Sequence, residues 1–108
     1  MKSNKFYIEH ILEAIGKIEC YLKDQTFESF SKNDMVIDAA IRELEIIGEA
    51  ATNVSEDYQE EHSNVPWDKM ISMRNRLIHE YFGVNKKIVW DTCEVDLKEL
   101  KNLIKPLV

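Results

Sequence analysis

The sequence predicts an all-α protein, an up-and-down bundle of four to five helices. Three observations lead to this fold class. Apolar residues recur every three or four positions through most of the 108-residue chain, which is the spacing of one helix face. Glycine and proline are scarce, at 3 and 2 residues, so long regular elements with few tight turns are favoured. No segment shows the strict alternation of a half-buried strand.

The first helix is expected over residues 5–23. Its apolar side chains fall on one face, and charged side chains fill the other. Ser3 and Asn4 precede it, and either side chain can accept a hydrogen bond from the free N–H groups of the first turn. This is the pattern of a surface helix that packs through one face.

A connection over residues 24–30 leads to a second helix, over residues 32–53. Ser31 and Asp34 form a capping box at its start. The helix is apolar on two faces, so it is either central in the bundle or in contact with a partner chain. Gly48 lies inside it, where glycine costs about 1 kcal/mol relative to alanine. Either another helix approaches closely at Gly48, or the glycine has no structural role.

The second half of the chain predicts three more elements. Residues 55–61 form a short acidic helix. A longer helix begins at Pro66 and ends just before Gly83, which suits a C-terminal cap. A last helix starts near Asn85 and ends at Pro106. One side of this last helix is apolar and consists of Val89, Cys93, Leu97, Leu100 and Ile104.

Length and composition limit the possible functions. Residues 1–108 are expected to form a single domain. No apolar run approaches the roughly 18 residues of a membrane span, and the N-terminus lacks a signal-peptide layout, so we expect a cytoplasmic protein without membrane contact. Cys20 and Cys93 are isolated and predict two free buried thiols in a reducing compartment.

The overall charge argues against a protein that coats nucleic acid. Acidic residues outnumber basic residues 20 to 14, which gives a formal charge of −6. Nucleic-acid binding depends on many phosphate contacts with lysine and arginine. Any activity on RNA must therefore depend on a local basic site.

Residues 74–81, Arg-Asn-Arg-Leu-Ile-His-Glu-Tyr, carry the most informative chemistry. At about 100° per residue, Arg74 falls in the middle of the apolar stripe of its helix. A guanidinium stays charged at any working pH, and its burial without a partner is expensive. We therefore expect Arg74 to meet a carboxylate, Glu45 or Glu49 of the second helix, or a phosphate that arrives with a substrate.

Asn75 and His79 lie one helical turn apart on a different face, with Arg76 close to them. An imidazole can move a proton near neutral pH. An arginine matches the charge and geometry of a phosphate in its transition state. Because RNA supplies its own nucleophile, the 2′-hydroxyl, these groups suit phosphodiester cleavage without a metal. The alternative is that His79 is a surface residue without a role, or a core residue whose hydrogen bonds are satisfied within the fold.

No motif for a cofactor or a metal ion is present. His62 stands beside Glu60 and Glu61 but lacks the further ligands of a zinc site. No phosphate-binding loop or dinucleotide fingerprint occurs. Neither a cofactor nor a metal ion is therefore expected.

The spacing of Arg74, Asn75 and His79 resembles the Arg-polar-x3-His signature of the HEPN superfamily of ribonucleases. The following Tyr81 resembles the His-x-Tyr extension of the HepT-like toxin branch. Residues 42–50 are also similar to the second helix of that family. The resemblance covers residues 6–107 and implies a HEPN-like helical fold.

The resemblance implies a metal-independent RNase toxin that acts as a homodimer. Two subunits would pair their motif helices, and the composite site would cleave RNA through a 2′,3′-cyclic phosphate. His79 would be the general acid and base, Arg74 the phosphate clamp, and Asn75 the orienting residue. The supporting residues would be Arg76, Glu45 and Glu49.

The resemblance also implies a partner, a minimal nucleotidyltransferase antitoxin of the MntA type. This partner would transfer AMP to Tyr81, and the added negative charge would repel RNA. A different function remains open on the same residues: a non-catalytic helical partner that binds RNA or a nucleotide for a nucleotidyltransferase.

Overall fold

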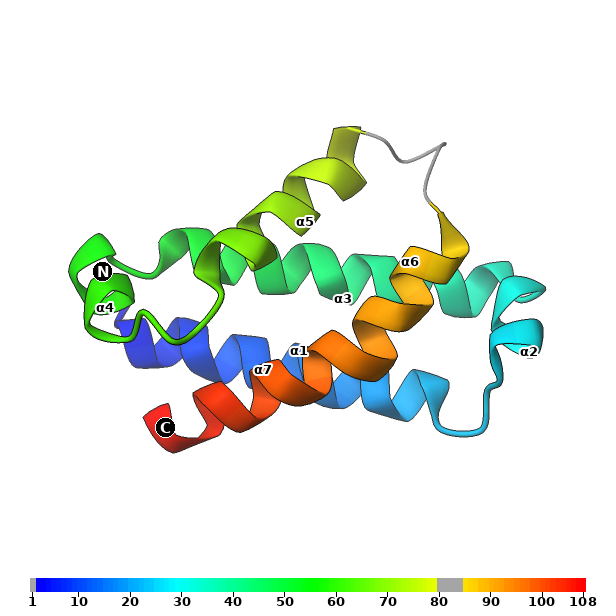
Figure 1. The fold of residues 1–108 in the computed structure, drawn as a ribbon, viewed down its shortest axis with the longest axis horizontal. Coiled ribbons are helices and arrows are strands. Elements are labelled where there is room, and N and C mark those ends of the chain that lie inside the picture. The colour runs from blue at the N-terminus through cyan, green and yellow to red at the C-terminus, as the bar shows by residue number, and fades with distance from the viewer. Residues whose placement is uncertain (1, 80–84) are drawn as a thin grey trace.

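The computed structural model describes residues 2–79 and 85–108. In these two ranges every regular element is a helix and none is a strand, so the all-α prediction is confirmed. The long helices α1 (Asn4–Leu22) and α3 (Asp34–Asn53) lie side by side, and α5 (Trp67–His79) packs on α3 (Figure 1). The expected cap at Gly83 lies outside the described residues.

Two short helices occupy opposite ends of the bundle (Figure 1). Helix α4 (Glu56–Glu61) confirms the acidic helix expected between α3 and α5. Helix α2 (Phe27–Ser31) was not expected, because residues 24–30 were predicted to be a connection. Its cap is Thr26, whose hydroxyl accepts a hydrogen bond from the N–H of Ser29 at 3.1 Å.

The start of α3 also differs from the prediction. Asn33 is the N-cap, and its side chain accepts a hydrogen bond from the N–H of Val36 at 3.2 Å. Ser31 cannot cap α3 because it belongs to α2, where its hydroxyl donates to the carbonyl of Glu28 at 2.8 Å. The predicted capping box is therefore wrong.

The two residues expected to cap α1, Ser3 and Asn4, make different contacts. Ser3 caps the helix and accepts a hydrogen bond from the N–H of Phe6 at 3.2 Å. Asn4 instead joins α1 to the start of α4. Its side chain donates to the hydroxyl of Ser55 at 3.1 Å and accepts from the N–H of Ser55 at 3.0 Å. These contacts fix the start of α1 beside the start of α4.

Helix α3 is central in the bundle, as its two apolar faces predicted. It packs on α1 and on α5, and it also contacts α2. The first predicted face is fully buried and consists of Ile37, Ile41, Leu44, Gly48 and Ala51. On the second face Ala50 is buried, while Val36 and Ile46 are partly buried.

Residues 86–107 form one continuous helical rod with an irregular turn. Helix α6 (Lys86–Asp91) passes through a π-helical turn (Thr92–Asp96) into α7 (Leu97–Ile104), and a 3₁₀ turn (Lys105–Leu107) follows. Asn85 caps α6 by accepting from two backbone N–H groups. The five apolar positions predicted for this helix are all buried.

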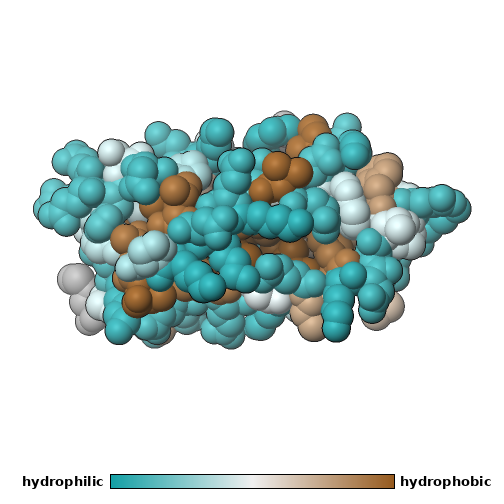
Figure 2. All heavy atoms as spheres, turned by 60° about the horizontal axis from the view of Figure 1, so that its bottom comes forward, coloured by the Kyte–Doolittle hydropathy of each residue, from teal (hydrophilic) through white to brown (hydrophobic). Residues whose placement is uncertain are grey.

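The exposure of the two cysteines corrects one prediction. Cys93 is buried, but Cys20 is exposed, so the prediction of two buried thiols is wrong for Cys20. Figure 2 shows a mostly hydrophilic face with separate hydrophobic patches. Among the helices described here, none has the length and apolar character needed to cross a membrane.

Candidate functional site

Gly48 lies where α5 crosses α3. A Cβ atom on Gly48 would be 2.7 Å from the carbonyl oxygen of Met70 and 2.9 Å from Cγ of Arg74, and closer still to Cβ of Arg74. Real Cβ atoms essentially never lie within 3.0 Å of such neighbours. The two helices can therefore approach this closely only because residue 48 has no side chain. This confirms the first of the two explanations that the sequence left open for Gly48.

Arg74 is held by two oxygen atoms beside this crossing. Its Nη2 lies 2.9 Å from Oε2 of Glu49, and its Nη1 donates a hydrogen bond to Oδ1 of Asn75 at 3.1 Å. Of the two carboxylates expected from the sequence, Glu49 makes the contact. A guanidinium carries more N–H donors than these two contacts use, so the group can still bind a phosphate.

The burial of Arg74 differs from the helical-wheel expectation. Its side chain is 32% exposed, so it lies at the edge of the apolar stripe and not in the middle. Met70 and Leu77 of the stripe are buried, whereas Ile78 is 45% exposed. The ion pair is accessible to solvent, so it orients the guanidinium more than it stabilises the fold.

The structure brings together only some of the predicted site residues. Arg74, Asn75 and Glu49 are in contact, and Arg76 is exposed on α5. His79 is the last residue of α5, but its side chain is outside the described part of the chain, as is the whole of Tyr81. The roles of these two residues therefore stay predictions.

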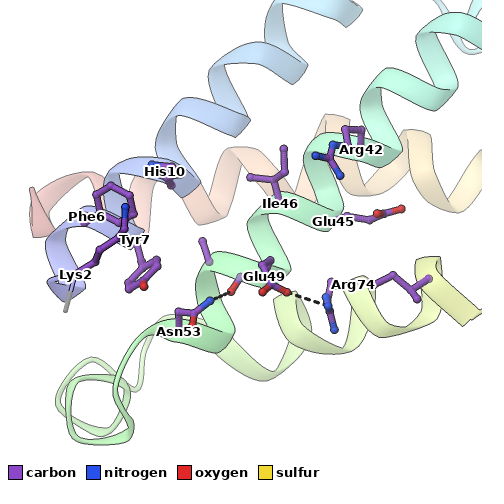
Figure 3. A pocket seen from close by; sticks show the side chains of 12 residues that line it. Lys2, Phe6, Tyr7, His10, Arg42, Glu45, Ile46, Glu49, Asn53 and Arg74 are labelled. Atoms are coloured by element: carbon purple, nitrogen blue, oxygen red, sulfur yellow. Dashed lines mark hydrogen bonds and ion pairs between the residues drawn. The ribbon is translucent and has the colours of Figure 1, made fainter.

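A groove of about 580 Å³ lies between α1, α3 and α5, with Arg74 on its wall (Figure 3). Phe6, Tyr7 and His10 of α1 line it, together with Lys2, which precedes the helix. From α3 come Arg42, Glu45 and Glu49, among others. Figure 3 shows Glu49 of α3 between the α1 side chains and Arg74 of α5. We call this feature the Arg74 groove.

Sequence reasoning missed the Arg74 groove because its walls come from three separate helices. One signal was present: Phe6 and His10 are four residues apart and therefore share a face of α1, and Lys2 stands shortly before them in the sequence. In the described ranges, no three side chains of His, Cys, Asp or Glu gather where they could hold a metal ion.

An all-helical bundle that carries an Arg-Asn pair and, four residues after Asn75, a histidine on the same helix is compatible with a HEPN-like fold. The comparisons with known proteins agree. The family model described as "Ribonuclease HepT-like" matches residues 11–107, and the chain belongs to this HepT-like ribonuclease family.

Two relatives illustrate the similarity. The chain is 42% identical over 108 residues to "Putative RNase TTE0752" of Caldanaerobacter subterraneus subsp. tengcongensis. This alignment covers 100% of this chain and 96% of the relative. It is also 42% identical over 106 residues to "Probable ribonuclease HepT" of Thermococcus cleftensis. That alignment covers 98% of this chain and 96% of the relative. No solved structure matches the chain.

Proposed function

We propose that this protein is an endoribonuclease that cleaves RNA without a metal ion. One observation carries the proposal within this ribonuclease family: Arg74 is held by Glu49 and Asn75 at the wall of an open groove. A guanidinium in that position can neutralise the charge that develops on a phosphate during cleavage. His79, one turn after Asn75 on the same helix, supplies an imidazole for proton transfer.

The proposed reaction is a transesterification within the RNA. One imidazole accepts the proton of the 2′-hydroxyl while that oxygen bonds to phosphorus. The bond between phosphorus and the 5′-oxygen of the next nucleotide breaks, and an imidazolium donates a proton to the leaving oxygen. The products are a 2′,3′-cyclic phosphate and a free 5′-hydroxyl. Arg74 stabilises the phosphate between these two proton transfers.

Two proton transfers are best served by two imidazoles, and each chain has one His79. We therefore propose a homodimer in which the two α5 helices approach each other and form one composite site. Such a pair would also concentrate positive charge in a chain whose formal charge is −6. Equilibrium sedimentation at micromolar concentration should give twice the chain mass, and a monomer at every concentration would contradict the composite site.

The experiment that tests the activity uses the purified protein, an RNA substrate and EDTA. Cleavage should persist in EDTA, and mass spectrometry should find 2′,3′-cyclic phosphate ends. His79→Ala should reduce the rate by at least about a hundredfold. His62→Ala removes an imidazole at the end of α4 and is the matched control, with an unchanged rate.

Two results would contradict this function. If cleavage disappears in EDTA and returns with magnesium, the reaction is metal-dependent. If RNA binds but is never cleaved, the chain is a non-catalytic binding partner.

Regulation forms the second part of the proposal. The chain would be the toxin of a toxin–antitoxin pair, with a minimal nucleotidyltransferase of the MntA type as antitoxin. The support is membership of the HepT-like family together with Tyr81, two residues after His79. AMP on the hydroxyl of Tyr81 would place negative charge close to the end of α5 and exclude RNA by repulsion and by occupation.

A further inference from the structure

We infer that the Arg74 groove binds the single-stranded RNA segment next to the scissile phosphate. This inference rests on the proposed ribonuclease function and adds the path of the substrate. The groove opens beside Arg74, and its volume of about 580 Å³ is typical of a ligand site. An RNA chain whose scissile phosphate meets Arg74 therefore has a path between α1 and α3.

The charges of the groove are complementary to phosphate. Three cations, Lys2, Arg42 and Arg74, line it together with two carboxylates, Glu45 and Glu49. Three positive and two negative groups leave a net charge of +1, in a chain whose formal charge is −6. Glu49 and Arg74 pair with each other, so the net charge of +1 comes from Lys2 and Arg42 against Glu45.

Arg42 is a cation of the groove whose charge is not paired within the described ranges. It is exposed on α3 and lines the groove, and it makes no hydrogen bond or ion pair with any other residue in the described ranges. Arg74, by contrast, has both Glu49 and Asn75 as partners. An unpaired guanidinium in a concave site is suited to a phosphate of the RNA backbone.

The α1 wall adds aromatic rings to these cations. The rings of Phe6 and His10 lie 4.3 Å apart between centroids, and Tyr7 meets the Phe6 ring edge-on at 5.2 Å. The ammonium group of Lys2 lies 4.3 Å from the centre of the Phe6 ring. A basic groove with neighbouring aromatic rings is the arrangement by which proteins bind single-stranded nucleic acid without a fixed sequence.

The test measures RNA binding separately from cleavage. In the His79→Ala background with EDTA, the fluorescence anisotropy of a short labelled single-stranded RNA gives the Kd over a range of salt concentrations. Arg42→Gln should weaken binding about tenfold and reduce the slope of log K against log salt by about 0.7, which is the value for one phosphate contact. Arg42→Lys should restore most of the slope.

Two further variants separate stacking from charge. Phe6→Leu should weaken binding while the salt slope stays unchanged, because it removes a ring and no charge. Lys23→Gln removes a positive charge just beyond the opposite end of α1, outside the groove, and should bind RNA like its parent. Melting curves and sedimentation of each variant show whether the fold and the oligomeric state are retained.

The outcomes distinguish this inference from the proposed function. If Arg42→Gln and Phe6→Leu bind RNA with the Kd and salt slope of the parent, the groove is not the RNA path, whether or not the natural chain cleaves RNA. If both variants turn a dimer into monomers, the groove is a subunit interface and the inference is wrong. If the natural chain does not cleave RNA but binding depends on Arg42, the ribonuclease proposal fails and the groove assignment stands.

Discussion

Gly48 and Arg74 lie against each other where α5 crosses α3. Because Gly48 has no side chain, Cβ and Cγ of Arg74 occupy the space that a Cβ atom on residue 48 would need. The next residue of α3, Glu49, then contacts the guanidinium of the same arginine at 2.9 Å. Glycine sets how closely α5 approaches, and the following glutamate sets where the guanidinium points. Two consecutive residues of α3 therefore position one side chain of the candidate site.

The first prediction concerns the two helical glycines. Gly48→Ala should lower the free energy of unfolding by about 1–3 kcal/mol, because the new methyl group meets the backbone of Met70 as well as Arg74. RNA cleavage should fall with it, since Arg74 is displaced. Gly16→Ala is the matched control. Gly16 is exposed within α1 with open space around it, so alanine should stabilise the protein by up to about 1 kcal/mol.

Chemical denaturation of both variants gives the two free energies, and an RNA cleavage assay gives the activity. If Gly48→Ala were as stable as Gly16→Ala, the close approach of α5 to α3 would have no energetic importance.

The second prediction tests the orientation of Arg74. Glu49→Gln keeps the size of the side chain but removes its charge. The unfolding free energy should change by less than about 1 kcal/mol, because the pair is solvent-accessible, with Glu49 58% exposed. The kcat for RNA cleavage should fall by about tenfold or more, since small displacements of catalytic groups have large effects on rate.

Glu13→Gln provides the comparison for Glu49→Gln. Glu13 pairs with Lys17 on the surface of α1 and neither residue lines the Arg74 groove, so the loss of this charge should leave kcat unchanged. A kcat that rises in Glu49→Gln would mean that Glu49 competes with the RNA phosphate for Arg74.

The third prediction distinguishes the two thiols. Burial, and to a lesser extent the neighbouring Glu94 carboxylate, raises the pKa of Cys93 to about 12. Cys20 is exposed. Maleimide at pH 8 should therefore modify one thiol per native chain and two in denaturant, as counted by mass spectrometry. Cys20→Ser should leave the native chain unmodified, and labelling of that variant would show that Cys93 is accessible.

The same pKa shift has a consequence for stability at high pH. The ordinary value is 9.0, so below that pH the thiol keeps its proton in both the folded and the unfolded chain. Between 9.0 and about 12 the unfolded chain loses the proton first, and the contribution of Cys93 to the unfolding free energy falls as the pH rises. Denaturation curves of Cys93→Ala across this range should lack that component of the decline.

The fourth prediction concerns Tyr81. Tyr81→Phe should retain RNA cleavage, because the proposed chemistry uses Arg74, Asn75 and His79. It should escape a nucleotidyltransferase antitoxin, because the variant has no hydroxyl to receive AMP. Mass spectrometry of the natural chain expressed with such a partner should locate AMP on the peptide that contains Tyr81. AMP on another residue, or continued neutralisation of Tyr81→Phe, would contradict the regulatory proposal and leave the ribonuclease proposal intact.

The long helices could be predicted from the sequence because their apolar faces repeat over four or more turns. Helix α2 could not, since Phe27–Ser31 has five residues and is too short to show a period. Helix α2 also decides which residue caps α3. Ser31 and Asn33 are both good capping residues, but Ser31 belongs to α2, so Asn33 is the N-cap of α3.

The sequence predicts which residue types form the candidate site, but it does not decide which of them are in contact. Arg74 needed a carboxylate, but Glu45 and Glu49 lie about one turn apart on α3 and were equivalent by sequence. The choice depends on where α5 crosses α3, which the close approach at Gly48 determines. The exposure of Cys20 is a related case, because the residue type alone favoured burial.

The π-helical turn at Thr92–Asp96 fixes the length of the last helical rod. Such a turn accommodates one residue more than a regular turn, and each residue rotates a helix by about 100°. Because the wider turn absorbs this residue, α6 and α7 keep the relative rotation of a regular helix that is one residue shorter. Deleting one residue within Thr92–Asp96 should therefore restore regular geometry and leave Leu97, Leu100 and Ile104 buried on the same side as Val89. Deleting one residue at the start of α7 would instead rotate the residues that follow by about 100°, so the π-helical turn is the place where this rod should best tolerate a single-residue deletion.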